Sequence, residues 1–217
     1  MTETLRDLVE LAVVVDETFD QNCYVLHRRD TDAALVFDPG LQHRRTLALL
    51  EKHRLRCERI LLTHGHPDHV NGVPAVRAAH HCDAAIHPED RVMLPHATRL
   101  PGVPADLPEV VAEVDLHAGE VLRWQDLEVK VLHTPGHTLG SVCFLVGRDL
   151  IAGDTLFQRS VGRTDLPGGS WETLIFSIEN QLYALPPETV VYPGHGPSTT
   201  IRDEMQYNPF VVHPRYR

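Results

Sequence analysis

Hydrophobic and polar residues alternate along the first part of the chain, as they do in strands with one buried face. The alternation covers residues 11–15, 23–26 and 33–37, with turn-forming residues between these segments. In residues 41–53 the leucines are spaced to lie on one face of a helix. Residues 60–63 are a run of leucine and β-branched residues, which is typical of a buried strand. The pattern predicts a β-meander followed by a helix and a buried strand.

The middle of the chain continues with shorter elements. Residues 70–79 are predicted to form a helix, and residues 84–86 a short strand. Residues 88–108 are rich in proline and have weak periodicity, so we expect an insertion that contains one or two helical turns. This insertion separates two parts of the chain with similar organisation.

The second half repeats the order of strands followed by helices. Strands are predicted at residues 120–122, 127–132, 142–146, 150–151 and 189–192. A helix over residues 172–185 is expected to have Ser170 as its N-cap, and Thr200 is expected to start a short helix that ends before Pro209. Two strand-rich halves, each completed by helices, predict two β-sheets packed face to face with helices on their outer faces. No segment has the composition of a linker, so we expect residues 1–217 to form a single domain.

Size and charge restrict the function classes. A chain of 217 residues with 42% hydrophobic residues is long enough to bury a substantial core. The formal net charge of −10 is spread along the chain, and an acidic protein repels the phosphate backbone of nucleic acids. We therefore expect no nucleic-acid partner.

The N-terminal residues and the cysteines indicate the compartment. Glu3, Asp7 and Glu10 make the first segment acidic, unlike the basic start of a secretory signal. No uninterrupted apolar run approaches the length that spans a membrane. The 4 cysteines are scattered without a short Cys-x-x-Cys pair, as in proteins that keep their thiols reduced. We predict a cytoplasmic protein without a membrane partner.

The motif His-Gly-His-Pro-Asp-His occupies residues 64–69, directly after a predicted buried strand. In an extended segment, residues i and i+2 point to the same side, so His64 and His66 are placed to bind one ion. The proline that follows turns the chain, and Asp68 and His69 then face a second point. The alternative is a polar loop in which Asp68 only caps a helix. The position at the end of a strand favours two metal sites.

Three further loops each offer one ligand beside a glycine. His137, Asp154 and His195 all follow predicted strands. Glycine permits tight turns and close approach of the backbone, so that a neighbouring imidazole or carboxylate can reach inward. Each loop taken singly also fits an ordinary turn. Together with residues 64–69, the three loops predict a pocket that holds two metal ions.

These motifs together resemble the metallo-beta-lactamase fold hydrolases over nearly the whole chain. Residues 21–23, 153–157, 161–165 and 208–210 are similar to the small glyoxalase II-like (hydroxyacylglutathione hydrolase-like) group. The resemblance implies the metallo-beta-lactamase fold, an α+β (αββα) sandwich of two mixed β-sheets with outer helices.

The resemblance also implies a role for each candidate ligand. The ligands of the first metal would be His64, His66 and His137, and those of the second Asp68, His69 and His195. Asp154 would bridge the two ions, and Asp38 would orient ligands or their loop. Nitrogen and carboxylate ligands suit several divalent transition metals, so we expect two such ions, with zinc first and iron or manganese as alternatives.

The expected reaction is hydrolysis of a thioester of the S-D-lactoylglutathione type. The two ions would supply a bridging hydroxide that attacks the carbonyl, and Asp68 would help to orient it. Arg163 corresponds to a basic residue near the glutathione moiety in the family, although it could equally be a salt-bridged loop arginine. Asp165 replaces an expected tyrosine, and the family's longer helical C-terminal region does not follow in this sequence. We therefore expect weaker or altered glutathione recognition.

Several alternatives are open at this point. The closest is a mononuclear-iron persulfide dioxygenase with Fe(II) on His64, His137 and Asp154. Residues 193–196 resemble the hydrolase version of that loop and favour hydrolysis. A phosphodiesterase is disfavoured by the acidic charge, a β-lactamase by the lack of an export signal, and a non-catalytic metal-binding module by the complete ligand set. Covalent catalysis by Cys23 or Cys143 is disfavoured because no thiol activator is evident.

Overall fold

The computed structural model describes residues 9–97 and 108–211, which form two compact units. The N-terminal unit comprises residues 9–62, residues 66–86 and the described part of residues 92–114. The C-terminal unit comprises residues 63–65, 87–91 and the described residues from 115 onward. A single domain over residues 1–217 stays a prediction, and each unit is described by itself.

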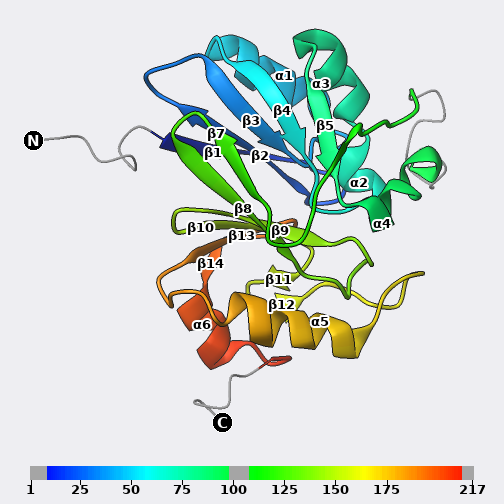
Figure 1. Cartoon of the computed structure of the whole chain (residues 1–217), viewed down its shortest axis with the longest axis vertical. Coiled ribbons are helices and arrows are strands. Elements are labelled where there is room, and N and C mark those ends of the chain that lie inside the picture. The colour runs from blue at the N-terminus through cyan, green and yellow to red at the C-terminus, as the bar shows by residue number, and fades with distance from the viewer. Residues whose placement is uncertain (1–8, 98–107, 212–217) are drawn as a thin grey trace, which may run out of the picture. The chain divides into compact units, whose positions relative to one another are not determined.

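The first sheet has six strands in the order β1-β2-β3-β4-β5-β6. They are β1 (Val9–Val15), β2 (Asn22–Arg28), β3 (Ala33–Phe37), β4 (Arg56–Leu61), β5 (Asp83–Ile86) and β6 (Val114–Asp115). β1, β2 and β3 form the predicted antiparallel meander, whereas β3, β4 and β5 are parallel. α1 (His43–Lys52) connects β3 to β4, and α3 (Val73–His80) precedes β5. The two helices lie side by side (Figure 1).

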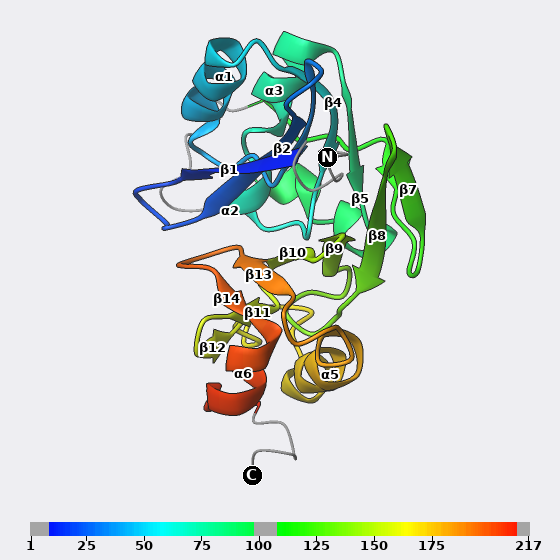
Figure 2. The ribbon, with the colours of Figure 1, turned by 90° about the vertical axis from the view of Figure 1, so that its left-hand side faces the viewer.

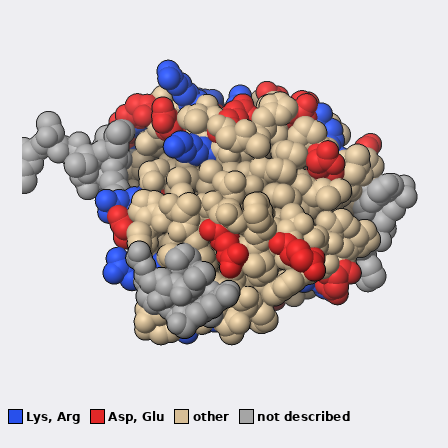
Figure 3. Space-filling view, turned by 60° about the horizontal axis from the view of Figure 1, so that its bottom comes forward, with Lys and Arg blue, Asp and Glu red and all other residues tan. Residues whose placement is uncertain are grey.

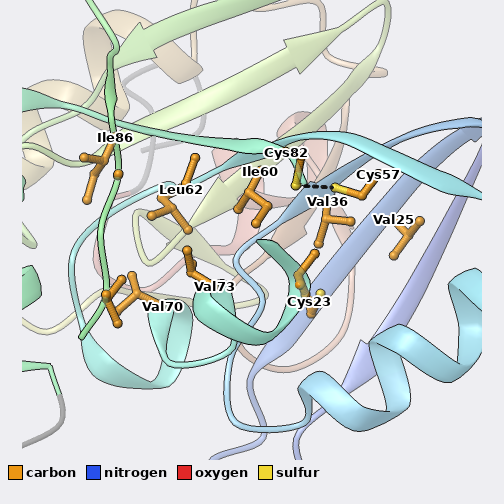
Figure 4. Packing of buried hydrophobic residues seen from close by; sticks show 14 of the residues in the cluster. Cys23, Val25, Val36, Cys57, Ile60, Leu62, Val70, Val73, Cys82 and Ile86 are labelled. Carbon is orange, nitrogen blue, oxygen red and sulfur yellow. Dashed lines mark hydrogen bonds between the residues drawn. The ribbon is translucent and has the colours of Figure 1, made fainter. Parts of the chain in front are cut away.

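Apolar side chains of the sheet and of these helices form the core of the N-terminal unit. Val36 on β3 and Ile60 on β4 are completely buried in one cluster with Val73 of α3 (Figure 4). Leu50 of α1 belongs to the same cluster. Burial of one such side chain contributes about 1.5–3 kcal/mol, so this cluster holds the parallel strands and their helices together.

The predicted helix over residues 70–79 is divided into α2 (Pro67–Val70) and α3. The amide of Gly72 donates a hydrogen bond to the carbonyl oxygen of Pro39 at 2.7 Å. A side chain at this position would collide with the carbonyl oxygen of Gly40, so only glycine permits the approach. A continuous helix was therefore the wrong prediction, because a contact with a distant turn interrupts it.

The second sheet also has six strands, in the order β14-β13-β10-β9-β8-β7. They are β7 (Val121–Trp124), β8 (Leu127–His133), β9 (Val142–Val146), β10 (Asp149–Gly153), β13 (Val190–Pro193) and β14 (Thr199–Thr200). β10 and β13 are parallel and the other neighbours are antiparallel. β11 (Leu156–Phe157) and β12 (Ser160–Val161) form a separate hairpin. The two mixed sheets with helices confirm the predicted fold class.

Two helices of the C-terminal unit begin where the sequence predicts. α5 (Trp171–Ser177) continues into the π-helical turn η3 (Ile178–Leu182), and α6 (Ile201–Tyr207) lies near the C-terminus. The Ser170 side chain accepts a hydrogen bond from the Thr173 amide, and that of Thr200 accepts one from the Asp203 amide. Both N-caps are thereby confirmed. α5 and α6 cover one face of the sheet (Figure 2).

Short helices occupy the start of the predicted insertion. They are α4 (Pro88–Arg91) and the 3-10 turn η2 (Leu94–His96), whereas residues 98–107 lie outside the described residues. In the described part of the chain, every helix falls short of the length and apolarity that crossing a bilayer requires. Acidic and basic side chains are dispersed among uncharged residues on the face shown in Figure 3.

A buried carboxylate holds the end of the C-terminal unit together. Glu204 on α6 is fully buried and accepts hydrogen bonds from the Arg159 amide at 2.9 Å and the Thr199 hydroxyl at 2.6 Å. The Asn208 side-chain amide donates to Glu204 at 2.9 Å and to the Ser160 carbonyl oxygen at 3.0 Å. Because Arg159 and Ser160 belong to the β11–β12 hairpin, Glu204 and Asn208 attach this hairpin to α6.

We predict that Glu204→Ala lowers the free energy of unfolding by about 3 kcal/mol, because it leaves three donors without their acceptor, two of them on the buried residues Thr199 and Asn208. Urea unfolding of the purified protein measures the change. Glu188, an exposed carboxylate 3.5 Å from Arg148, provides the control, and Glu188→Ala should change the stability by less than about 0.5 kcal/mol. Equal effects of the two substitutions would contradict the role of Glu204.

Candidate metal centre

Four predicted ligands lie together in the C-terminal unit. Nε2 of His137 is 3.3 Å from Nε2 of His64 and 3.5 Å from Oδ2 of Asp154. The same Asp154 oxygen is 3.5 Å from Nε2 of His195. Asp154 and His195 follow the parallel strands β10 and β13, whose carboxyl ends meet at one edge of the sheet. One carboxylate oxygen therefore lies within reach of two imidazoles.

Hydrogen bonds orient the two most buried imidazoles of this group. Nδ1 of His137 lies 2.7 Å from the carbonyl oxygen of Arg163. A carbonyl oxygen only accepts, so Nδ1 donates its proton and Nε2 keeps a lone pair for a metal ion. Nδ1 of His64 lies 3.0 Å from the Thr63 hydroxyl oxygen. Both rings therefore direct Nε2 toward the same point.

The N-terminal unit carries the other predicted ligands, which lie at the start of α2. His66 has an extended backbone with φ −71° and ψ 146°, and Pro67 begins the helix after it. Nε2 of the buried His69 is 3.6 Å from Oδ2 of Asp68. Nδ1 of His69 is 2.9 Å from Oδ2 of Asp38, so that the carboxylate accepts its proton and Nε2 carries the lone pair that a metal ion would bind.

The turn that contains Asp38 is packed tightly against α2. Asp38 is buried and has a φ of 49°, in the left-handed region. Its carbonyl oxygen accepts a hydrogen bond from the Gln21 side-chain amide at 3.1 Å. A side chain on Gly40 would collide with the Asp68 carbonyl oxygen. The turn and its glycine thereby hold the Asp38 carboxylate beside His69.

The spacing of these donor atoms fits a transition-metal ion. Two ligand atoms about 2.0–2.1 Å from a tetrahedral zinc ion are about 3.4 Å from each other. Within the C-terminal unit, the donor atoms of the pairs His64–His137, His137–Asp154 and Asp154–His195 are separated by 3.3–3.5 Å. Imidazole and carboxylate donors suit zinc, iron and manganese, so the donor set fits but does not select the metal.

The family of the chain follows from comparison with known proteins. Residues 16–195 match the family model described as Metallo-beta-lactamase superfamily. The chain belongs to this superfamily. The predicted resemblance is therefore confirmed, and we assign the protein as a metal-dependent hydrolase of the metallo-beta-lactamase superfamily.

Relatives of this superfamily member cover nearly its whole length. Hydroxyacylglutathione hydrolase GloC of Haemophilus influenzae is 34% identical, over 94% of this chain and 98% of its own length. The crystal structure of the B3 metallo-beta-lactamase BLEG-1 has a TM-score of 0.87 and 37% identity, covering 94% of this chain and all of that one. A di-iron-bound structure of TTHA1623 has a TM-score of 0.82 and 36% identity, covering 92% of this chain and 100% of its own. These similarities confirm the metallo-beta-lactamase fold.

Arg163, the predicted substrate-binding residue of this metallo-beta-lactamase superfamily member, is exposed and paired with a neighbour. Its Nε and Nη2 atoms donate to the two carboxylate oxygens of Asp165 at 2.7 and 2.8 Å. This pairing lowers the pKa of Asp165 to about 2. The salt-bridged alternative therefore describes the Arg163 side chain in this structure, while substrate binding stays a prediction. The backbone carbonyl of Arg163, by contrast, orients His137.

The cysteines offer no accessible nucleophile. Cys23 and Cys143 are buried, with 2% and 0% of their surfaces exposed. Burial raises the pKa of Cys23 to about 12, so its thiol stays protonated at neutral pH. The Cys143 thiol donates to the Ala152 carbonyl oxygen at 3.4 Å. Both observations support hydrolysis without a covalent cysteine intermediate.

Sequence reasoning missed three side chains that contact the ligand loops. They are Thr63, which contacts His64, and Asp90 and Thr138, which form a hydrogen bond with each other next to the His137 loop. Thr63 and Thr138 are direct neighbours of predicted ligands in the sequence, a signal that could have marked them. Asp90 lies in the proline-rich insertion, where no local pattern distinguishes it from the adjacent Glu89.

We predict that Asp38→Ala weakens zinc binding about 10- to 100-fold, because His69 loses the carboxylate that orients its ring. Asp38→Asn should have a smaller effect, since asparagine also adopts left-handed backbone angles and its carbonyl oxygen can accept the proton of Nδ1. Competition with a chromophoric chelator measures the affinity.

The control for this experiment is Asp32→Asn, which changes an exposed carboxylate in the turn between β2 and β3 and should leave zinc affinity unchanged. Wild-type affinity in Asp38→Ala would show that this carboxylate does not support a metal ligand.

Proposed function

We propose that the protein hydrolyses a thioester of the S-D-lactoylglutathione type to a free acid and a thiol, using two divalent metal ions. The observation that carries the proposal is the position of one Asp154 oxygen 3.5 Å from Nε2 of both His137 and His195. A shared carboxylate is what two adjacent ions need. The relative named hydroxyacylglutathione hydrolase supports the thioester as substrate class.

The proposed ligand sets are those that the family resemblance implies. His64, His66 and His137 would bind the first ion, and Asp68, His69 and His195 the second, with Asp154 between them. Support comes from the ring orientations of His64, His69 and His137, each fixed by a hydrogen bond at Nδ1. Zinc is the first candidate for both ions, and the di-iron form of the similar protein TTHA1623 supports iron as the alternative.

The chain's own residues have defined tasks in this reaction. When bound, the two ions lower the pKa of a water molecule to about 7 and polarise the substrate carbonyl. The carboxylate of Asp68, a partly buried residue, would accept a hydrogen bond from the attacking water and orient it. The buried carboxylate of Asp38 keeps His69 in the tautomer that leaves Nε2 unprotonated. No cysteine takes part.

The proposed partner is a small thioester in the cytoplasm, with a glutathione conjugate as the first candidate. Asp165 forms an ion pair with Arg163 through two hydrogen bonds. Because this pairing competes with a glutathione carboxylate for Arg163, it supports altered glutathione recognition. Neither nucleic acid nor a membrane surface is part of this proposal, in keeping with the acidic charge of −10.

The proposal predicts chelator-sensitive hydrolysis of S-D-lactoylglutathione by the metal-loaded protein, followed as disappearance of the thioester absorbance. Asp154→Ala should lower kcat at least about 1000-fold, because both ions lose a ligand. His117→Ala, which removes an exposed histidine outside the proposed ligand set, should keep wild-type activity.

A panel of short acyl thioesters and an oxygen electrode with glutathione persulfide complete this test. Absence of hydrolysis throughout the panel contradicts the proposal. Oxygen uptake by a protein that holds one iron would instead establish the persulfide dioxygenase alternative.

The role of Arg163 can be measured separately. If Arg163 binds a carboxylate of the glutathione moiety, Arg163→Ala should raise KM for S-D-lactoylglutathione about threefold and leave kcat unchanged, as expected for an exposed charge pair worth about 0.7 kcal/mol. The KM for a thioester without the glutathione moiety serves as the internal control. Equal KM changes for both substrates would show that Arg163 does not bind the glutathione moiety and only pairs with Asp165.

A further inference from the structure

We propose that Asp90 is a positioning residue that ties the loop of His64 to the loop of His137 and so holds these two imidazoles at the spacing of metal ligands. The proposal rests on the proposed metal-dependent function. Asp90 lies on α4 and is 1% exposed. A carboxylate is retained in such a buried position only when hydrogen-bond donors compensate its charge.

Three donors from two separate loops surround the Asp90 carboxylate. Oδ2 accepts hydrogen bonds from the Gly65 amide at 3.0 Å and from the Thr138 hydroxyl at 2.7 Å. Oδ1 accepts one from the Gly140 amide at 2.7 Å. Hydrogen bonds to an ionised acceptor are about twice as strong as neutral ones. One side chain therefore fastens both loops.

The donors are direct neighbours of the two imidazoles. Gly65 follows His64 in the chain, and Thr138 follows His137. The Nε2 atoms of these histidines are 3.3 Å apart, although 73 positions separate the residues in the sequence. Because each ring is already fixed at Nδ1, the remaining freedom is the distance between the two loops. Asp90 restricts this distance.

The hydroxyl groups beside Asp90 have a single consistent arrangement of protons. An ionised carboxylate only accepts, so the Thr138 hydroxyl must donate to Asp90. The Ser141 hydroxyl, 2.6 Å from the Thr138 hydroxyl oxygen, then donates to Thr138. The Thr138 amide in turn donates to the Ser141 hydroxyl oxygen at 3.1 Å. The charge of Asp90 thus orders the whole turn that follows His137.

The close approach of this turn to α4 depends on a glycine. A Cβ atom on Gly140 would lie 2.7 Å from Cγ of Asp90 and 2.8 Å from its backbone nitrogen. Neither a displaced backbone nor a displaced carboxylate would preserve the three hydrogen bonds. Gly140 therefore leaves the room that the Asp90 carboxylate needs beside this turn, and Ser141 supplies the hydroxyl that donates to Thr138.

A role confined to folding would give different results from a positioning role. If Asp90 only stabilises the fold, its replacement lowers the stability and leaves the affinity and geometry of the metal site intact. If Asp90 positions His64 and His137, its replacement changes the coordination of an ion on these residues as well. Cobalt(II) distinguishes the two cases, because its visible absorption spectrum depends on coordination geometry.

The experiment is titration of the full-length apoprotein with cobalt(II), monitored by visible absorption, with urea unfolding of each variant in parallel. Asp90→Asn replaces one accepting oxygen by an NH2 group, which cannot accept a hydrogen bond from the donors on that side, and should weaken cobalt binding at least about tenfold, with an altered spectrum. Glu89→Gln, on the exposed side of α4, is the matched control and should behave as wild type.

A second pair of variants keeps the test decisive if Asp90→Asn does not fold. Thr138→Val retains the shape of the side chain and removes one donor to Asp90, and should weaken cobalt binding about threefold. Thr138→Ser restores the hydroxyl and should restore the affinity and the spectrum.

Wild-type cobalt affinity and spectrum in Asp90→Asn or Thr138→Val, with only lower stability, would overturn the positioning role. Because cobalt binding needs no substrate, a wild-type protein that binds cobalt but hydrolyses no thioester overturns the proposed substrate alone, and the Asp90 comparison still decides the positioning role.

Discussion

The hydrogen bond at the second nitrogen of each buried imidazole is the interaction on which the rest of the site depends. His64, His69 and His137 are all buried, and each has an oxygen atom within 3.0 Å of Nδ1. These oxygens belong to a hydroxyl, a carboxylate and a backbone carbonyl. In each case the bond fixes the ring plane, and the carboxylate and the carbonyl accept the Nδ1 proton, so that Nε2 of His69 and of His137 carries the lone pair. Loss of such a bond would leave the orientation of the ring less well fixed and would lower the affinity for an ion.

The fold supplies the oxygens through close approaches of backbone segments. The left-handed Asp38 turn lies against α2 because Gly40 and Gly72 leave room for it. In the C-terminal unit, the Arg163 carbonyl reaches His137, and Asp90 and Gly140 fasten the turn that follows. These contacts thus fix the conformations of the glycine-rich loops. This rigidity is consistent with electrostatic preorganisation, in which ligands are placed before the substrate arrives.

Sequence patterns predicted the parts of this protein that depend on local order. Ala33–Phe37 and Val142–Val146 have the predicted bounds, because alternation and β-branched residues mark them. Strands of two residues, such as β11 and β12, are too short for any periodicity. The break before α3 depends on Pro39, more than thirty positions earlier. Asp90 could not be found for the same reason, since its partners are two backbone amides and a hydroxyl from distant loops. That His64, His137, Asp154 and His195 lie together was predicted because their residue types and spacing are specific, while their roles as ligands stay a prediction.

The central claim is that seven residues hold two metal ions, with Asp154 shared. An anomalous difference map from crystals of the protein loaded with zinc, collected on both sides of the zinc edge, tests this claim most directly. The account predicts two peaks, one coordinated by His64, His66 and His137 and the other by Asp68, His69 and His195, with Asp154 bound to both. A single peak on His64, His137 and Asp154, or none at these residues, would contradict it.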